Sequence, residues 1–382
     1  MVKIGFDGKR AVQNYTGLGN YSRYIADIVC RFQPANDYIL YAPKREENKR
    51  LTQLIALHSQ LHLSYPQTTF WKKLNSLWRI WGITRQLEKE KIAIFHGLSN
   101  ELPLNIRHSQ VRSVVTIHDL IFLRYPQYYK PIDRNIYAYK FRKACINADK
   151  VVAISECTKR DIIKFFHIPD EKIEVIYQSC DPAFAQAISA EKKAEVKKKY
   201  QLPDQYILNV GSIEERKNIL TAVKTLPNLP TDIHLVIVGR RTAYTKRVES
   251  VVQQSKLEDR VHIINNLPFD DLPALYQGAK LFVYPSRFEG FGIPIIEALQ
   301  SGIPVVATTG SCLEEAGGPD SIYVHPDDVD GMTKAFMTIL HDENKRGYMI
   351  AKGKEYANQF SEEKQAKQLA DIYHTLATSS AR

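Results

Sequence analysis

Apolar residues in this chain gather in short runs that are separated by longer amphipathic or polar stretches. Most runs are rich in valine, isoleucine, leucine and aromatic residues, which favours buried strands. The strands that this pattern predicts lie at residues 2–6, 38–42, 92–95, 111–117, 151–154 and 173–176, and again at 206–210, 234–238, 261–264, 281–284, 303–307 and 322–324. Helical patterns lie between many of them, so an α/β protein with parallel sheets is predicted.

The helices that the pattern predicts recur at three- and four-residue spacing. They lie at residues 21–28, 70–90, 158–166, 187–200, 218–225, 272–278, 294–300, 330–341 and 361–377. A chain of 382 residues exceeds one ordinary core, and the strand–helix alternation restarts after the lysine-rich stretch 187–200. We therefore expect a first domain at 1–180, a second at 181–360, and a terminal segment at 361–382 that is largely one amphipathic helix.

Charge is distributed unevenly along the chain, whose formal net charge is +10. Residues 1–180 hold 28 lysines and arginines against 16 aspartates and glutamates, whereas residues 181–382 hold 24 against 26. A basic N-terminal half favours an anionic partner, such as a membrane surface, a phosphate-bearing substrate or a nucleic acid. The cations form no dense run and no nucleic-acid motif is present, so nucleic acid is not expected.

The remaining bulk features favour a cytoplasmic protein. No apolar run reaches the roughly 18 residues that a membrane span needs. The first residues are typical of a strand rather than a signal peptide. Five cysteines are scattered without a CxxC pair, which argues against a disulfide framework or a zinc site.

The stretch 281–308 carries the strongest candidate chemistry. It predicts a strand, a glycine- and proline-rich loop, a short helix and a second strand, with the loop at the carboxyl edge where α/β sheets bind ligands. Glu289 lies on the loop and Glu297 on the helix. The amides of Phe291, Gly292 and Ile293 lie near the helix N-terminus, which suits an oxygen-rich ligand. Spacing alone equally allows two solvated carboxylates in an ordinary α/β loop.

Two further glycine-containing turns are candidates for binding an anion. Gly17 and Gly19 end a long loop before a helix, although they do not form GxGxxG, and a flexible loop is the alternative. In the second half, Gly211 follows a strand, and Arg216 and Lys217 precede the next helix. Adjacent cations oppose the dipole at a helix N-terminus, which makes sense if a diphosphate shares the site. An exposed basic turn is the alternative.

Several other predicted strands end in polar residues. His118 follows the strand 111–117 and is a candidate donor, acceptor or acid–base group, with a structural histidine as the alternative. Ser155 is expected to cap the following helix. Asp328 and Asp330 form a DxD pattern, but a helix follows directly and capping explains the pattern better.

Residues 70–90 predict a basic, aromatic amphipathic helix. Its apolar positions recur at helical spacing, lysines and arginines surround them, and the three tryptophans of the chain all lie here: Phe70, Trp71, Leu74, Leu77, Trp78 and Trp81, with Lys72, Lys73, Arg79 and Arg85. Such a helix suits an anionic membrane interface. A core-facing helix with charged flanks is the alternative.

Taken in order, these motifs resemble those of the retaining GT-B glycosyltransferases of family 4, over nearly the whole chain. The specific parts are the E-x7-E motif from Glu289 to Glu297, in the setting FEGFGIPIIEALQSGIPVVAT, and the G-x4-R-K-N element from Gly211 to Asn218. His118-Asp119, Ser155-Glu156 and the Gly17/Gly19 loop follow the order of the family. The N-terminal half is most similar to bacterial mannosyltransferases of O-antigen and exopolysaccharide assembly.

The resemblance implies two facing Rossmann-like domains with a central cleft, and a C-terminal helix that crosses back to the N-terminal domain. It implies a nucleotide-sugar donor as substrate, with no further cofactor and no metal. Glu297 would hold the ribose, Arg216 and Lys217 the diphosphate, and Glu289, with the amides of Phe291 to Ile293, the sugar. The other implied roles are His118 at the sugar, Gly17 and Gly19 near the diphosphate, Gly211 in the G-x4-R-K-N turn, and Gly239, Asn266 and Leu267 near the base.

The implied reaction is transfer of a hexose, most simply mannose from GDP-mannose, to a lipid-diphosphate glycan or oligosaccharide in bacterial surface polysaccharide synthesis. The enzyme would then act in the cytoplasm or at the inner face of the membrane. A UDP-glucose-dependent enzyme with a soluble acceptor, a nucleotide-sugar hydrolase or epimerase, a nucleic-acid-binding protein and a non-catalytic scaffold are the alternatives. Both a front-face mechanism and a covalent intermediate on Glu289 fit the sequence.

Overall fold

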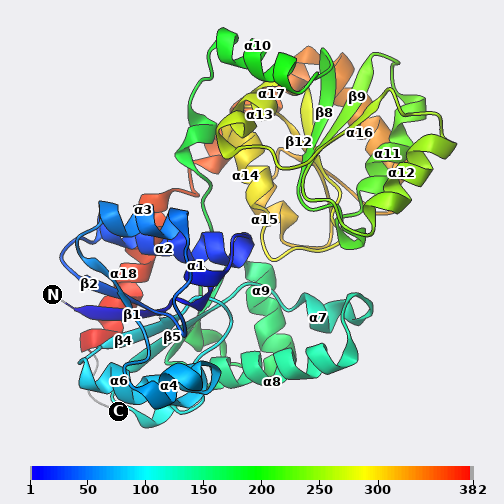
Figure 1. Cartoon of the computed structure of the whole chain (residues 1–382). Helices are drawn as coiled ribbons and strands as arrows, with labels where there is room; N and C mark the ends of the chain where they lie inside the picture. Colours follow the sequence, from blue (N-terminus) through cyan, green and yellow to red (C-terminus); the bar gives the residue numbers. More distant parts are fainter. Residues whose placement is uncertain (1, 379–382) are drawn as a thin grey trace. The chain divides into compact units, whose positions relative to one another are not determined.

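The computed structural model describes residues 2–378. The described chain forms two compact units. Residues 178–361 make up the C-terminal unit, and the described residues before and after them make up the N-terminal unit. Each unit is a parallel sheet covered by helices on both faces (Figure 1).

The N-terminal unit contains a seven-stranded parallel sheet in the order β3-β2-β1-β4-β5-β6-β7. Its strands are β1 Lys3–Asp7, β2 Asp37–Tyr41, β3 Leu61–Ser64, β4 Ile94–Gly97, β5 Arg112–Ile117, β6 Lys150–Ala153 and β7 Ile173–Val175. Its α-helices are α1 Lys9–Gln13, α2 Gly17–Phe32, α3 Lys49–Leu57, α4 Thr69–Lys73, α5 Asn75–Leu77, α6 Ile83–Lys89, α7 Ile121–Arg124, α8 Pro131–Asn147, α9 Glu156–Asp161 and α18 Glu362–Thr378. The strand order reverses between β1 and β4, as at the ligand-binding edge of doubly wound sheets.

The C-terminal unit contains a six-stranded parallel sheet in the order β10-β9-β8-β11-β12-β13. Its strands are β8 Gln205–Val210, β9 Ile233–Val238, β10 Val261–Ile264, β11 Leu281–Tyr284, β12 Val305–Thr308 and β13 Ile322–Val324. Its α-helices are α10 Ala190–Lys199, α11 Ile219–Thr225, α12 Thr245–Gln254, α13 Leu272–Gly278, α14 Ile293–Gln300, α15 Leu313–Gly317, α16 Val329–His341 and α17 Glu343–Ala357. The order reverses between β8 and β11, so the turns after these strands meet at one edge.

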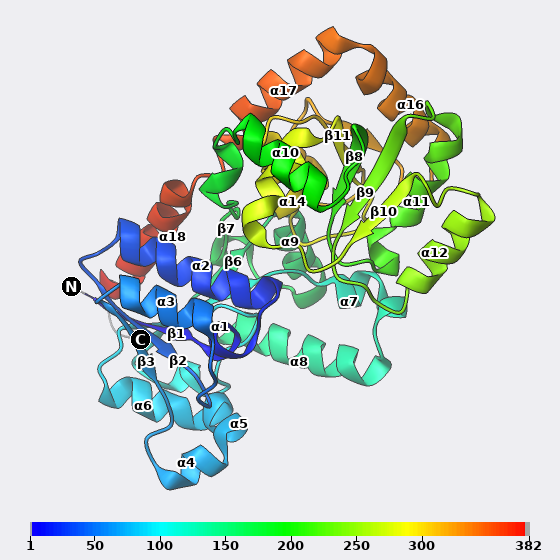
Figure 2. The same cartoon turned by 45° about the horizontal axis from the view of Figure 1, so that its top comes forward.

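The C-terminal helix α18 returns to the N-terminal unit, as predicted, and packs beside α2 (Figures 1 and 2). Its apolar face, including Leu369 and Ile372, belongs to the same buried cluster as β1 and α2. Polar contacts fix its position: Tyr24 donates to Gln365 over 3.0 Å, the Tyr373 hydroxyl lies 2.7 Å from His96 Nδ1, and Arg31 pairs with Glu362 over 2.9 Å. The helix therefore completes the core of a unit whose other elements lie far earlier in the sequence.

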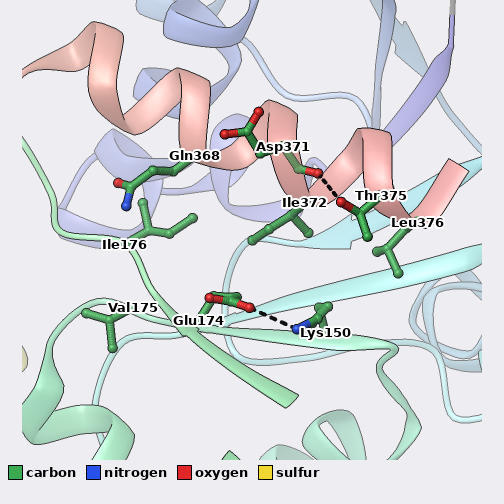
Figure 3. Close-up of a pocket in the computed structure, with 9 residues that line it drawn as sticks. All are labelled: Lys150, Glu174, Val175, Ile176, Gln368, Asp371, Ile372, Thr375 and Leu376. Carbon is green, nitrogen blue, oxygen red and sulfur yellow. Dashed lines mark hydrogen bonds and ion pairs between the residues drawn. The ribbon is translucent and has the colours of Figure 1, made fainter. Parts of the chain in front are cut away.

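A crevice of about 270 Å³ remains where α18 passes the edge of this sheet (Figure 3). Ile372 and Leu376 line it from the helix, and Lys150 and Glu174 line it from β6 and β7. The two charged side chains pair with each other over 2.8 Å. Since the crevice lies along the packing of α18, we interpret it as a feature of that packing.

The prediction of a single helix at residues 70–90 is wrong. The structure divides it into α4, α5, a π-helical turn Trp78–Gly82, and α6. Leu74 leaves helical geometry with ψ near 45° and separates α4 from α5. At Gly82, a β-carbon would lie 2.7 Å from the Trp71 indole, so glycine lets the tryptophan pack against the turn.

Candidate active site

Glu289, Arg216 and Lys217 meet at the carboxyl edge of the second sheet. Arg216 Nη1 lies 2.9 Å from Glu289 Oε2, and Lys217 Nζ lies 3.3 Å from Glu289 Oε1. Ser286 donates to the same carboxylate over 2.8 Å, and Lys217 donates to the Tyr284 hydroxyl over 2.8 Å. Residues separated by about 70 positions thus form one buried polar cluster, which their spacing in the sequence does not show.

The electrostatics of the cluster keep all three charges in place. Burial raises the pKa of Glu289, but the charges of Lys217 and Arg216 outweigh it and lower the pKa to about 2. Burial lowers the pKa of Lys217, and Glu289 outweighs it and raises the pKa above its usual value. Glu289 is therefore an anion and Lys217 a cation at neutral pH, and a second carboxylate, Glu214, lies 3.9 Å from Arg216 Nη2.

The backbone conformation of this turn positions the side chains of Arg216 and Lys217. Glu215–Lys217 form a 3-10 turn, and Asn218 follows in the left-handed region with φ 55°. Asparagine tolerates that conformation, and here its side chain donates to the carbonyl oxygens of Pro285 and Pro326. Arg287 N donates to Arg216 O over 2.9 Å. The cations thus precede a tight turn and do not lie inside the first turn of α11.

Glycines bring the neighbouring strand ends close to Lys217. Gly211 has φ 154°, and a β-carbon there would lie 3.1 Å from Lys217 Nζ. At Gly239, which follows β9, a β-carbon would lie 1.8 Å from Gly211 O. Packing against backbone therefore requires glycine at position 239, and the backbone conformation favours it at position 211. Asn266 follows β10 with φ 57°, and Leu267 beside it is half-buried, so both lie near this edge.

Glu297 lies on α14, away from the cations. Its Oε2 accepts from the Tyr276 hydroxyl over 2.7 Å. Burial raises the pKa of Glu297 to about 7, assisted by the negative charge of Asp181, although the Tyr276 hydrogen bond acts in the opposite direction. The E-x7-E spacing therefore carries two carboxylates of opposite behaviour, one fixed as an anion and one that titrates near neutral pH. Tyr276 belongs to no recognisable sequence motif, so the sequence alone gives no signal for its contact with Glu297.

The N-terminus of α14 points into the same region. None of the described side chains caps this helix, and Gly292 occupies the cap position with φ 153°. Cys312 donates from Sγ to Phe291 O over 2.7 Å and to Glu289 O over 3.1 Å, which holds the loop in shape. The helix dipole therefore adds positive potential at Gly292 and Ile293.

In the N-terminal unit, the loop predicted to end at Gly19 is shorter than expected. Helix α1 interrupts it, and α2 begins at Gly17, so both glycines lie in the first turn of α2. A β-carbon at Gly19 would lie 1.9 Å from Asn14 O, whereas a β-carbon at Gly17 would meet nothing within 4 Å in the described chain. Packing therefore requires Gly19 but leaves Gly17 without a structural reason.

His118 is buried directly after β5. Its backbone N–H donates to Asn100 Oδ1 over 2.7 Å. Its ring Nε2 lies 2.9 Å from Leu98 O. A carbonyl oxygen only accepts, so Nε2 carries the proton and Nδ1 is an acceptor. Burial lowers the pKa of His118 to about 4, which keeps the ring neutral. The Tyr21 ring contacts it edge-on at 4.5 Å between centroids.

The capping predictions are confirmed. Ser155 accepts from the Thr158 amide at the start of α9, and Asp328 accepts from the Gly331 amide at the start of α16. Among residues 2–378, no group of three or more histidine, cysteine, aspartate or glutamate side chains is arranged to hold a metal ion. No helix in that range is long and apolar enough to cross a membrane.

Two family models match consecutive parts of the chain. The model described as Glycosyltransferase Family 4 matches residues 22–184, and the model described as Glycosyl transferases group 1 matches residues 189–356. The O-antigen chain mannosyltransferase B of Escherichia coli is 32% identical over 296 residues, covering 76% of each chain. The chain belongs to the group 1 glycosyltransferases.

Other relatives of this glycosyltransferase agree with that assignment. The O-antigen chain mannosyltransferase RfbU of Salmonella typhimurium is 30% identical over 225 residues, covering 59% of this chain and 60% of RfbU. The crystal structure of Anabaena Alr3699/HepE in complex with UDP has a TM-score of 0.78 at 16% identity, covering 98% of this chain and 100% of HepE. The predicted GT-B fold is thereby confirmed.

Proposed function

We propose that this glycosyltransferase moves mannose from GDP-mannose, with retention of configuration, onto a lipid-linked or oligosaccharide acceptor in bacterial surface polysaccharide synthesis. The observation that carries the reaction type is the buried cluster of Glu289, Arg216 and Lys217 at the edge of the second sheet. The choice of mannose and of an O-antigen-like acceptor is supported by the names of the relatives.

The cluster provides what departure of a diphosphate needs. Negative charge develops on the leaving group as the glycosidic bond breaks, and preorganised cations stabilise that charge without reorganising. Arg216 and Lys217 are already held by Glu289, Tyr284 and the turn at Asn218. We therefore assign the two cations to the donor diphosphate, with the amides at Gly292 and Ile293 as further donors.

The remaining site residues receive the roles that the family resemblance implies. In the C-terminal unit, Glu297 holds the ribose hydroxyls, and Glu289 lies beside the sugar together with Phe291. Gly211 and Gly239 keep the strand ends open to the nucleotide, and the base lies near Asn266 and Leu267.

In the N-terminal unit, the neutral His118 offers Nδ1 to a sugar hydroxyl. Gly17 and Gly19 let the start of α2 approach the donor. The open space at Gly17 supports this role, since packing gives no reason for a glycine there.

We further propose that residues 70–90 bind an anionic membrane at the inner face of the cell membrane. Phe70, Leu74, Leu77 and Trp81 are all exposed, with Lys72, Lys73 and Arg85 exposed among them. Trp78 and Arg79 do not belong to this surface: Trp78 is buried, and Arg79 pairs with Asp7 and Glu101. The surface is therefore narrower than the sequence pattern predicts.

A second candidate donor is a UDP-sugar. It is favoured by the fold neighbour HepE, whose structure was determined in complex with UDP. A thermal-shift comparison of GDP-mannose, UDP-glucose and ADP-glucose separates these donors, because a ligand at 100 times its dissociation constant stabilises a protein by about 2.7 kcal/mol. A larger shift with UDP-glucose than with GDP-mannose would replace the first proposal by the second.

A further inference from the structure

A basic cavity lies at the carboxyl edge of the first sheet, in the N-terminal unit. It has a volume of about 700 Å³ and is lined by the segments that follow β2 and β3 and by Lys72 of α4. Its polar lining consists of Lys44, Arg45, Ser64, Tyr65, Gln67 and Lys72. The lining thus carries three cations and no carboxylate.

Two of the three cations have charge available for a ligand. Lys44 pairs with Glu46 over 2.5 Å, which offsets its charge. For Arg45 and Lys72, no carboxylate lies within ion-pair distance in the described part of the chain. Both side chains are exposed, and the Arg45 guanidinium lies 5.1 Å from the centroid of the Tyr65 ring, which restricts its orientation.

Neighbouring groups hold the floor of the cavity in shape. Gln86 donates to Ser64 Oγ over 3.0 Å and to Tyr65 O over 3.3 Å. Gln67 donates to Glu90 over 2.7 Å, and Glu90 also accepts from Tyr41 over 2.5 Å. Glu90 thus accepts hydrogen bonds beside the lining and lies within ion-pair distance of neither Arg45 nor Lys72.

The same edge carries His118, which the proposed function places at a sugar hydroxyl. In the strand order, β2 and β5 are separated by β1 and β4, so their ends are about 14 Å apart at the usual strand spacing. His118 follows β5, and the cavity lies at β2 and β3. A ligand that extends along this edge therefore passes from the cavity, across the turn after β1, to the histidine.

The exposed apolar surface of residues 70–81 continues from the cavity. Lys72 lines the cavity and lies on α4, between Phe70 and Leu74 in sequence, and Phe70, Leu74, Leu77 and Trp81 are all exposed. Figure 2 shows α4 and α5 at the periphery of the N-terminal unit. A ligand with an anionic end and a long apolar chain would match both the basic cavity and the exposed apolar side chains of residues 70–81.

We propose that this cavity binds a diphosphate group, supplied by the acceptor, with Arg45 and Lys72 as its charged ligands. The lipid chain attached to that diphosphate lies on the apolar surface of residues 70–81, and its glycan extends along the sheet edge toward His118. The identity of the acceptor as a lipid diphosphate rests on the proposed function, whereas the anion site rests on the cavity itself.

Hydrogen–deuterium exchange on the full-length protein tests the site, because it separates the cavity from the donor site. The probes are pyrophosphate, a short-chain polyprenyl diphosphate, and phosphatidylcholine vesicles with and without phosphatidylglycerol. We expect both diphosphates to protect residues 43–48 and 64–73. The double variant Arg45→Gln/Lys72→Gln is expected to weaken this protection about 100-fold, since each lost charged hydrogen bond contributes about tenfold.

The control variant Lys3→Gln/Lys367→Gln removes the same charge from exposed positions of the same unit that neither line the cavity nor belong to residues 70–90. Tighter binding of the polyprenyl diphosphate than of pyrophosphate identifies a lipid headgroup, and equal binding identifies a free diphosphate; either result supports the site. The proposed diphosphate site would be overturned if both double variants lost protection by the diphosphates equally. It would also be overturned if anionic vesicles protected these residues and the diphosphates did not. Protection of residues 211–218 by nucleotide-sugars, measured in parallel, tests the proposed function separately.

Discussion

Arg216 Nη1 lies 2.9 Å from Glu289 Oε2, and both side chains are largely buried. Removing one partner of a buried pair leaves the other charge uncompensated, which typically costs about 3–5 kcal/mol. The pair therefore links the stability of the C-terminal unit to the proposed chemistry, and substitutions on its two sides should have different effects.

Substituting Glu289→Ala is expected to destabilise the protein by about 3–5 kcal/mol, because Arg216 and Lys217 then repel each other without a counter-charge. Urea unfolding of the full chain measures this. Glu215→Ala is the matched control, since Glu215 is exposed and lies 3.5 Å from the exposed Arg247. Equal destabilisation by the two substitutions would contradict the account of the cluster.

The variant Arg216→Ala is expected mainly to lower kcat, by about 100- to 1,000-fold, since a preorganised donor is lost where charge develops. Steady-state kinetics with varied donor separates kcat from KM. A rise in KM alone would mean that Arg216 contributes to ground-state binding rather than to departure of the diphosphate.

Donor affinity is expected to depend on pH through Glu297. The pKa of this carboxyl is raised to about 7 from the usual 4.5, chiefly by burial, so the group is protonated below that pH and a carboxylate above it. In the proposed function the carboxylate accepts hydrogen bonds from both ribose hydroxyls, so affinity should increase as the pH rises through 7. Calorimetric titration across this range measures the effect.

Two variants of this site sharpen the pH test. Glu297→Gln should remove the pH dependence. Tyr276→Phe should shift the midpoint upward, because the Tyr276 hydroxyl stabilises the carboxylate. A pH profile that both variants leave unchanged would exclude Glu297 as the titrating group.

The raised pKa also predicts the sign of a stability effect. In the unfolded chain the Glu297 carboxyl ionises near 4.5, and in the folded chain near 7. Its contribution to the free energy of unfolding is therefore fully present below pH 4.5 and is lost as the pH rises through 7. Without donor, Glu297→Gln should make unfolding less dependent on pH across this window.

Gly17→Ala tests whether the start of α2 approaches a ligand. A β-carbon there meets nothing within 4 Å in the described residues, and alanine favours helix, so stability should be kept or slightly increased. If backbone at this turn contacts the donor, donor affinity should fall without loss of stability. Gly19→Ala is expected to destabilise the unit instead, because its β-carbon would overlap Asn14 O. Unchanged kinetics for Gly17→Ala would remove Gly17 from the site.

The anchoring of α18 predicts a stability effect far from the proposed chemistry. Tyr373→Phe leaves His96 Nδ1 buried without its partner, which should cost about 1–3 kcal/mol. Tyr348→Phe, at a half-exposed position of α17, is the control. Equal unfolding midpoints for the two variants would show that the hydrogen bond contributes little to holding the helix.

Sequence patterns predicted most strands because parallel strands buried on both faces are continuous apolar runs. The strand β3 was missed, since its sequence LHLS is short and lies at the edge of the sheet. The helices α3, α8, α12 and α17 received no prediction; α8 and α17 carry apolar residues on several faces and show little periodicity. The 70–90 helix failed because burial of Trp78 and packing of Trp71 on Gly82 override local periodicity.

The candidate site was predictable only as a set of separate residues. The E-x7-E spacing pointed to Glu289 and Glu297, and the R-K pair to the cations, but no local pattern indicates which of them touch. The opposite pKa shifts of the two glutamates depend on the fold: Lys217 and Arg216 lower the pKa of Glu289, whereas burial raises the pKa of Glu297 against the opposing effect of the Tyr276 hydrogen bond. Only the fold brings those partners together.

We propose above all that the cluster at Glu289 and the carboxyl of Glu297 bind a nucleoside diphosphate sugar, with GDP-mannose as the preferred donor. The most direct test is calorimetric titration of GDP-mannose, UDP-glucose and ADP-glucose against the wild-type protein and Glu297→Ala. The account predicts that GDP-mannose binds most tightly and that Glu297→Ala weakens this binding while the protein stays folded. Equal affinity of the two proteins for GDP-mannose, or no binding by the wild type, would contradict it.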